Sequence, residues 1–504
     1  MALSQIVLCR QLNSPRGAAP RGGRLSMKAV GRFVISLAIC ATATCARAAA
    51  QEQENPFARI GHIVVIFTEN RSFDHVFGLF PGAEGINSAQ HPPQVDFDGR
   101  PLAALPRPRA DDRFPRRLPN APFRLETFVD IDGHTMDPVH DFYLEQEQID
   151  GGKMDRFVEA SNAGALVMGY YDGSELKQWA LAKEFTLADH FFHAAFGGSM
   201  LNHFFLICGC APVFDNPVEA TRKKFLPKLA TIKDSQGAEL TIREREEDSP
   251  PSVLDGPPRH KRFGRLTMDL EAIGTLQPGN PVSKHDKTEA QERLPPAHAP
   301  TIGDRLTEKN VTWAWYAGGW RDVIEGRLKP YEDKPDAFQT HHQPFAYFAN
   351  YAEGREGRAH LKDADEFFRA IEKGELPQVS FYKPLGVFNG HPDYSDLAAG
   401  DAHVADVVAR LRKSPNWADM LIIITADENG GFWDHVAPPR RDQFGPGVRV
   451  PTLIISPFAK KGFVDKTVYD TLSVLRTIEL RFGVAPLSER DARAADLRNA
   501  LVAP

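Results

Sequence analysis

Two short polar stretches of this chain carry side chains that could hold a cation. Glu69 and Asn70 directly follow an apolar, β-branched run near the start of the sequence, and Asp427 and Glu428 directly follow a similar run near its end. Three carboxylates that meet at one place repel one another unless a cation lies between them. Each acid alone could instead cap a helix or sit in a turn, but the repetition of the pattern favours a shared site.

A serine between two glycines and an apolar segment is the candidate nucleophile. Ser199 follows Gly197 and Gly198, and the apolar run after it continues to Cys208 before Gly209 stops it. This pattern predicts that Ser199 begins a helix, where backbone N–H groups and the helix dipole favour an anion such as an alkoxide or a phosphate. On the residues alone, a simple helix-capping role for the serine is the plainer interpretation.

Several histidines could add proton-transfer chemistry to such a site, although a lone histidine more often has a structural role. Two of them are adjacent, and neighbours on an extended strand point to opposite faces, so both can reach one site only in an irregular turn. The proline at position 344 makes such a turn plausible. The candidates are His140, the less certain His134, His341, His342 and His391.

These side chains need elements to position them, and the apolar patterning supplies strands and helices in alternation. Alternation of this kind predicts an α/β fold, with a mostly parallel central sheet and helices on both of its faces. Ligands of such sheets bind at the carboxyl ends of the strands, where the acids lie. The strands are expected at 63–67, within 185–196, and at 311–316, 378–382, 421–425 and 451–456. The helices are expected at 174–182, with Ser174 as its cap, and at 363–373, 402–413 and 470–482.

The composition is that of an ordinary enzyme, with 504 residues and a formal net charge of -6. No basic field suggests nucleic acid as a partner. Residues 51–504 are expected to form a single domain. Within it, the Pro- and Arg-rich stretch 90–120 predicts a surface loop, and the charged, Pro-rich stretch 216–300 predicts a variable insertion that forms a smaller cap with hairpin-like pieces.

The N-terminus has the pattern of a signal peptide. Lys28 and Arg32 precede an apolar stretch, 33–46, that is short for a membrane span, and small residues follow it. Residues 1–50 are therefore interpreted as a leader whose true start is Met27. We expect a periplasmic or secreted protein without a stable membrane anchor.

Few cysteines remain outside that leader. Only Cys208 and Cys210 lie beyond it, which excludes a disulfide framework. The pair could close a strained bridge or remain as two buried thiols, and we expect the thiols.

The motifs ENRSFDH, at 69–75, and DENGGFWDH, at 427–435, resemble the signature ends of the bacterial acid phosphatase and phospholipase C phosphoesterase family. That family is similar to alkaline phosphatase in fold, and the resemblance runs from about Ile60 to about Phe482. It implies that one divalent metal ion of unknown identity is held by Glu69, Asn70, Ser199, Asp427 and Glu428. It also implies that Ser199 is the nucleophile and becomes a phosphoserine. The phosphate oxygens would be held by His140, His341, His342 and His391, one of which would protonate the leaving alcohol.

The resemblance leaves the substrate open between two branches. The adjacent histidines match the acid phosphatase branch, which implies hydrolysis of small phosphomonoesters. The alternative is a phospholipase C that cleaves phosphatidylcholine-type phosphodiesters. A secreted binding protein on an inactive fold is disfavoured by the intact acidic set and Ser199, and a sulfatase by the missing cysteine signature.

Overall fold

The computed structural model describes residues 55–88, 91–332 and 338–503. The predicted leader, its apolar stretch and the predicted start at Met27 lie outside these residues and remain predictions. No helix in the described part of the chain has both the length and the apolar character needed to span a membrane.

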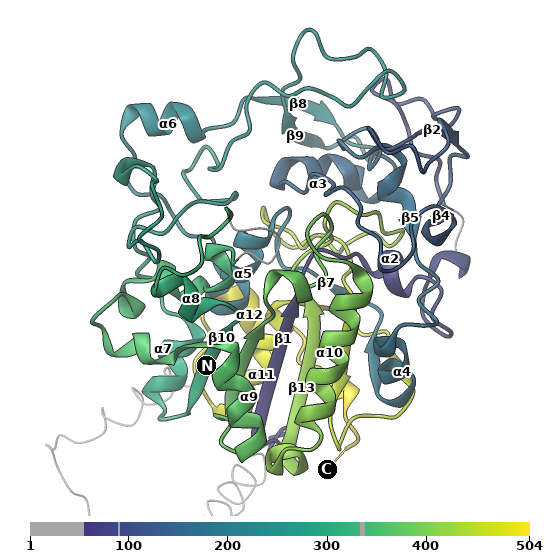
Figure 1. Ribbon diagram of the computed structural model, residues 1–504. Coiled ribbons are helices and arrows are strands. Elements are labelled where there is room, and N and C mark those ends of the chain that lie inside the picture. Colours follow the sequence, from purple (N-terminus) through teal and green to yellow (C-terminus); the bar gives the residue numbers. More distant parts are fainter. Residues whose placement is uncertain (1–54, 89–90, 333–337, 504) are drawn as a thin grey trace, which may run out of the picture. The chain divides into compact units, whose positions relative to one another are not determined.

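An eight-stranded sheet forms the centre of the fold (Figure 1). Seven strands run parallel, and only β14 runs against both of its neighbours. The predicted mostly parallel α/β sheet is therefore confirmed. The strands lie in the order β11 (Leu361–Asp363), β10 (Trp313–Ala317), β12 (Val379–Lys383), β1 (His62–Thr68), β13 (Met420–Ala426), β14 (Thr452–Ile455), β6 (Thr186–Ala188) and β15 (Phe463–Asp465).

The two most apolar strands, β1 and β13, lie side by side in the middle of the sheet. They are parallel, and their register pairs Thr68 with Ala426. All seven residues of β13 and the five central residues of β1 are buried. Such burial on both faces explains their continuous apolar sequence, because helices cover a parallel sheet from both sides.

Helices cover both faces of this sheet, as predicted. Figure 1 shows α9 and α10 in front of the central strands and α11 behind them. The helices are α2 (Phe73–Phe77), α3 (Phe142–Ile149), α4 (Lys177–Glu184), α5 (Ser199–Cys208), α6 (Glu219–Phe225), α7 (Ile302–Glu308), α8 (Trp320–Ile324), α9 (Ala364–Lys373), α10 (Leu397–Leu411), α11 (Leu472–Phe482) and α12 (Glu489–Ala492).

The remaining strands form four small two-stranded pairs outside the main sheet. They are β2 (Leu105–Pro106) with β3 (Arg117–Leu118), β4 (Phe123–Arg124) with β5 (Gly169–Tyr170), β7 (Phe191–Phe192) with β16 (Tyr469–Asp470), and β8 (Leu229–Lys233) with β9 (Glu239–Arg243).

One predicted helix start is wrong. Helix α4 begins at Lys177, not at Ser174, and Leu176 occupies its N-cap position without a side-chain hydrogen bond. Asp401 of α10 supplies the cap instead, because its carboxylate accepts hydrogen bonds from the backbone N–H of Lys177 at 2.7 Å and of Gln178 at 2.9 Å. A partner distant in sequence thus replaces the local serine that pattern reasoning expects.

The expectation of two free thiols is also wrong, because Cys208 and Cys210 form a disulfide. Gly209 between them is the C-cap of α5 and has a φ of 59°. This left-handed turn reverses the chain and brings the two Cα atoms to 5.2 Å.

The charged stretch 216–300 contains α6 and the hairpin of β8 and β9, with irregular segments elsewhere. It packs onto α3 through two arginines. The Arg243 Nε lies 3.2 Å from Asp141 Oδ1, and Arg245 contacts Glu147 at 2.8 Å. Asp141 is the N-cap of α3 and follows His140 directly. The hairpin thereby braces the end of α3 nearest that histidine, while the extent of the insertion and the single-domain assignment remain predictions.

Candidate active site

The carboxyl ends of β1 and β13 bring the four predicted acidic and amide side chains together. Because Thr68 pairs with Ala426, the next residue of each strand, Glu69 and Asp427, leaves the sheet at the same level. The backbone N–H of Asn70, which has a φ of 47°, donates to Asp427 Oδ1 at 3.1 Å. These side chains and that of Glu428 are buried. The structure therefore brings these four side chains together, while their role in binding a metal ion stays a prediction.

Ser199 lies at the first residue of α5, as expected, with Gly198 as the N-cap. A glycine is required at position 197, because φ is 78° there and a Cβ would come within 2.3 Å of the Phe142 nitrogen. The Ser199 hydroxyl lies 3.3 Å from Glu69 Oε2, 3.3 Å from Glu428 Oε1 and 3.4 Å from Asn70 Oδ1. A helix start thus presents a hydroxyl to three oxygen groups, which is more than a capping role requires.

A buried lysine completes this cluster, and sequence reasoning missed it. The Lys383 ammonium lies 2.5 Å from Glu69 Oε1 and 4.0 Å from Asp427 Oδ2, and it donates to the Thr68 carbonyl oxygen at 3.4 Å. Lys383 is the last residue of β12, which pairs with β1. Its place at the end of a predicted strand is the same signal that Glu69 and Asp427 carry, and it could have been found in that way.

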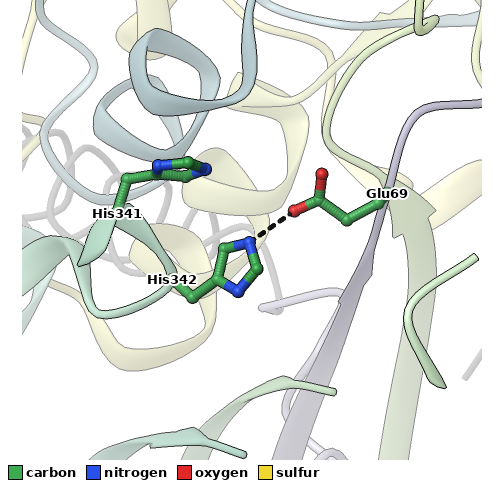
Figure 2. Close-up of side chains that lie close together, drawn as sticks. All are labelled: Glu69, His341 and His342. Carbon is green, nitrogen blue, oxygen red and sulfur yellow. Dashed lines mark ion pairs between the residues drawn. The ribbon is translucent and has the colours of Figure 1, made fainter. Parts of the chain in front are cut away.

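The adjacent histidines face Glu69 from a loop between β10 and β11. Figure 2 shows Glu69 and His342 pointing toward one another, with His342 Nε2 2.9 Å from Glu69 Oε1. His341 lies beside them, with its ring 4.9 Å from that of His342. Both histidines belong to a single 3-10 turn, Thr340–His342. This turn brings the pair to one side of the site, as the sequence required.

A further buried histidine was also missed. His203 stacks against His342 with ring centroids 5.8 Å apart, and its Nδ1 donates to the Ser199 carbonyl oxygen at 2.8 Å. It follows Ser199 by one helical turn, a spacing that places both residues on one face of α5. That spacing is the sequence signal that could have found it.

The other predicted histidines divide into two groups. His140 Nε2 lies 3.5 Å from Glu428 Oε1 and 3.3 Å from the Asn70 amide nitrogen. The ring of His391 lies 6.1 Å from that of His140. His134, in contrast, is exposed, and its Nδ1 bonds the Asp393 carbonyl. Among the described residues no contact joins His134 to the carboxylates, so it is not brought into the site.

Burial and unequal charge pairing separate the pKa values of the acids. Burial alone would raise the pKa of Glu69, but Lys383 and then His342 hold it well below its usual value. Burial, followed by the charge of Glu69, raises the pKa of Asp427 to about 7. Burial and the charge of Asp427 raise the pKa of Glu428 well above its usual value. Lys383 therefore stabilises Glu69, His140 faces Glu428 at 3.5 Å, and within the described ranges Asp427 has no cation of its own.

Burial and charge pairing also separate the pKa values of the four predicted histidines. Burial lowers the pKa of His342 to about 4 and holds those of His341 and His391 below their usual value. His140 is the exception: burial opposes its charge, yet Glu428 and then Asp137 raise its pKa to about 10. Among these four histidines, the surroundings of His140 thus favour the charged form and those of the other three disfavour it.

The residues present fit a divalent metal ion. Asp427 Oδ2 is buried without a hydrogen-bond partner, and so is the Nε2 atom of His203. Ligand atoms of Glu69, His203 and Asp427 lie within 4.8 Å of one another. A buried carboxylate oxygen without a donor, beside further oxygen groups, is the environment that a hard cation stabilises.

Known proteins resemble this chain along most of its length. The sequence pattern of the Phosphoesterase family matches residues 60–485. A non-hemolytic phospholipase C of Pseudomonas aeruginosa is 23% identical over 84% of this chain and 54% of its own length. Phospholipase C A of Mycobacterium tuberculosis is 24% identical over 84% of this chain and 73% of its own length. This chain therefore spans about half the length of the Pseudomonas protein.

A solved structure of a protein in the alkaline phosphatase superfamily from Vibrio parahaemolyticus is also similar, with a TM-score of 0.30 and 11% identity over 70% of this chain and 69% of that one. The family match carries the stronger information, because it includes both acidic motifs, Ser199 and all the histidines of the site. This match agrees with the resemblance to phosphoesterases of the motifs at 69–75 and 427–435. The chain belongs to the Phosphoesterase family.

Proposed function

We propose that this protein hydrolyses phosphoric esters with Ser199 as its nucleophile. The observation that supports this most is the position of the Ser199 hydroxyl, 3.3 to 3.4 Å from oxygen atoms of Glu69, Asn70 and Glu428 at the start of α5. We assign to this oxygen set one divalent metal ion. When bound, such an ion lowers the pKa of a serine hydroxyl and screens the charge of the phosphate.

The residues of the chain then divide the reaction between them. Ser199 releases its hydroxyl proton to solvent water, its oxygen bonds to phosphorus, and the ester bond to the leaving alcohol breaks, which leaves a phosphoserine. Water attacks this phosphoserine, releases phosphate and restores the hydroxyl. His140, cationic beside Glu428, is suited to hold a phosphate oxygen and to protonate the alcohol. His341, whose Nε2 atom is buried without a hydrogen-bond partner, can donate an N–H group to another oxygen as a neutral imidazole. The N–H of neutral His342 is directed at Glu69 and that of His391 at the Pro392 carbonyl oxygen, so we assign these two to phosphate contacts only in their protonated form.

For the substrate class we propose small phosphomonoesters, as in an acid phosphatase. A monoester carries more negative charge on its terminal oxygens than a diester and profits more from several convergent donors. His140, and His341 through its Nε2 atom that is buried without a hydrogen-bond partner, can supply such donors.

Phospholipase C activity is the second candidate, because the two relatives described above carry that name. Both candidates share the attack on phosphorus. They differ in the substrate, because a phosphodiester carries a second ester group on phosphorus that a phosphomonoester lacks.

Three substrates assayed side by side separate these candidates. We expect turnover of p-nitrophenyl phosphate to exceed that of bis-p-nitrophenyl phosphate and phosphatidylcholine by at least about tenfold in kcat/KM, which is about 1.4 kcal/mol of transition-state discrimination. A preference for phosphatidylcholine assigns the phospholipase C alternative. Absence of turnover on all three, in protein that binds metal, contradicts hydrolysis and points to the binding-protein alternative.

We also propose export to the periplasm or the medium, based on the predicted leader. N-terminal sequencing of the protein from both fractions tests this: a start directly after residue 48 or 50 is expected, and an intact Met1 or Met27 in a protein confined to the cytoplasm contradicts it.

A further inference from the structure

Two stretches that have no part in the catalytic site meet to form a cleft. One is the Pro- and Arg-rich loop 90–120, which contains β2 and β3, and the other is the irregular part of the 216–300 segment around 250–259. The turn 161–164 closes the cleft between them. The cleft has a volume of about 670 Å³. We call it the arginine cleft.

Positive charge dominates this cleft. Two of its arginines have carboxylate partners, since Arg107 pairs with Asp112 at 2.5 Å and Arg259 with Asp248 at 2.9 Å. One further acid, Asp255, lines the wall. The five arginines that line it are Arg107, Arg109, Arg116, Arg117 and Arg259. Three carboxylates thus face five guanidinium groups, which leaves an excess of two positive charges.

That excess resides on side chains without an ion-pair partner. Within residues 55–88, 91–332 and 338–503, no ion pair involves Arg109 or Arg116, and both side chains are exposed. In the part of the chain that the structure describes, the side-chain hydrogen bond of Arg117 goes to a neutral acceptor, the Leu254 carbonyl oxygen, at 3.3 Å. Guanidinium groups that line one cleft repel one another, and an anion bound between them relieves that repulsion.

The backbone that carries these arginines is held in place. Leu105 pairs with Leu118 and Pro106 with Arg117 across the β2–β3 ladder. Gly164 lies so close to this ladder that a Cβ would come within 2.7 Å of the Pro106 carbonyl oxygen.

The opposite wall is attached to the same loop through Asp96. Its carboxylate accepts hydrogen bonds from the Ser252 hydroxyl and, at 3.0 Å, from the Val253 N–H. Hydrogen bonds between the two stretches therefore define the spacing of the cleft walls.

We propose that the arginine cleft binds a soluble small molecule that carries two or more phosphate groups. A guanidinium matches a phosphate with two parallel N–H donors, and three arginines without a carboxylate partner beside two with one suit more than one phosphate. The concave volume admits a small molecule, whereas a flat bilayer surface would meet only the rim. The ligand is chemically related to the substrates proposed above, but the cleft contains none of the catalytic residues, so the proposal does not depend on their roles.

The cleft nevertheless borders the catalytic site. Asn162 lines it, and its side-chain oxygen accepts a hydrogen bond at 2.8 Å from the backbone N–H of Val139, the residue before His140. Arg113, in the same loop as the cleft arginines, donates to the His134 carbonyl oxygen at 2.9 Å. A ligand in the cleft would therefore bind beside the segment that carries a catalytic histidine.

Isothermal titration of fructose 1,6-bisphosphate tests the proposal. The protein carries Ser199→Ala so that the probe is not hydrolysed, and saturating orthophosphate fills the catalytic site. We expect one equivalent to bind, with an affinity that falls as NaCl is added, because salt screens exposed charges. The Arg109→Ala/Arg116→Ala variant should bind at least about tenfold more weakly, since charge-assisted hydrogen bonds are lost. Fructose 6-phosphate should also bind more weakly than the bisphosphate.

An equal loss of charge elsewhere provides the control. Arg355 and Arg493 are exposed and lie outside the cleft, and their double alanine variant should bind the probe as the parent does. Arg116→Glu, a single change, repeats the test if the double variant unfolds. Equal affinity of the parent and the cleft variants, or no binding beyond the orthophosphate-filled site, overturns the proposal. Arginine-dependent sedimentation with phosphatidylglycerol vesicles, without bisphosphate binding, also overturns it in favour of a lipid headgroup.

Discussion

The ammonium of Lys383 lies 2.5 Å from Glu69 Oε1, and both side chains are fully buried. The same ammonium is 4.0 Å from Asp427 Oδ2, so one positive charge faces two carboxylates at the ends of neighbouring strands. Buried charges are stable only when they are paired. Lys383 thus neutralises one of the two carboxylates, that of Glu69, and holds it in a fixed orientation. A second cation is needed to neutralise the carboxylate of Asp427.

Replacement of Lys383 by methionine should therefore destabilise the metal-free protein. The loss of one partner from a buried ion pair costs about 3–5 kcal/mol, because the other charge is left uncompensated. Added divalent metal should recover part of this loss, since it takes over the compensation of Glu69. Chemical unfolding with and without metal measures both effects. Lys466→Met, an exposed lysine, is the matched control. Equal stability of the Lys383 variant and the control contradicts the role.

Removal of either anchoring carboxylate should abolish metal binding. Glu69→Ala and Asp427→Ala each remove an oxygen group from the cluster around Ser199, and both variants should remain folded but lose nearly all activity. Elemental analysis of the purified variants provides the measurement, with Glu372→Ala, at an exposed acid of α9, as the control. Full metal occupancy in both site variants would place the metal elsewhere.

Replacement of Ser199 by alanine should stop turnover while the fold is retained. The Ser199 hydroxyl lies 3.3 to 3.4 Å from oxygen atoms of Glu69, Asn70 and Glu428, and its own oxygen is the atom that must bond to phosphorus. Mass spectrometry of acid-quenched wild-type protein with substrate should find phosphate on Ser199, and orthophosphate should still bind to the variant. Phosphate found on another residue would refute the assignment.

Metal binding should depend on pH through Asp427. Its pKa in the metal-free protein is raised to about 7, chiefly by burial. A metal ion binds the ionised carboxylate, so protons compete with it below that value. Affinity should fall about tenfold from pH 8 to pH 6 on this group alone, with proton release on binding at pH 7. Titration calorimetry in buffers of different ionisation enthalpy counts these protons, and a pH-independent affinity would exclude this competition.

The same shift predicts the sign of the stability change. A carboxyl whose folded pKa is raised contributes stability that is fully present below its unfolded value near 4 and is lost as pH rises through about 7. The metal-free protein should therefore be less stable at pH 8 than at pH 5 through this group, and Asp427→Asn should reduce that difference. Unfolding midpoints of the two proteins at the two pH values test this.

Sequence patterns alone determined the strands that matter most here. The apolar runs before Glu69 and Asp427 predicted β1 and β13, because strands buried on both faces have such continuous, β-branched apolar sequence. The glycines before Ser199 predicted its place at the start of α5. These features are local, since burial, turn geometry and helix starts are encoded within a few neighbouring residues.

Tertiary structure decided what those elements meet. Lys383 belongs to the site only because β12 pairs with β1, and the pKa of His140 is raised only because Glu428 arrives from the far end of the chain. Asp401 caps α4 in place of Ser174 for the same reason. Charge pairing and burial depend on distances between residues far apart in sequence, and local patterns do not contain those distances.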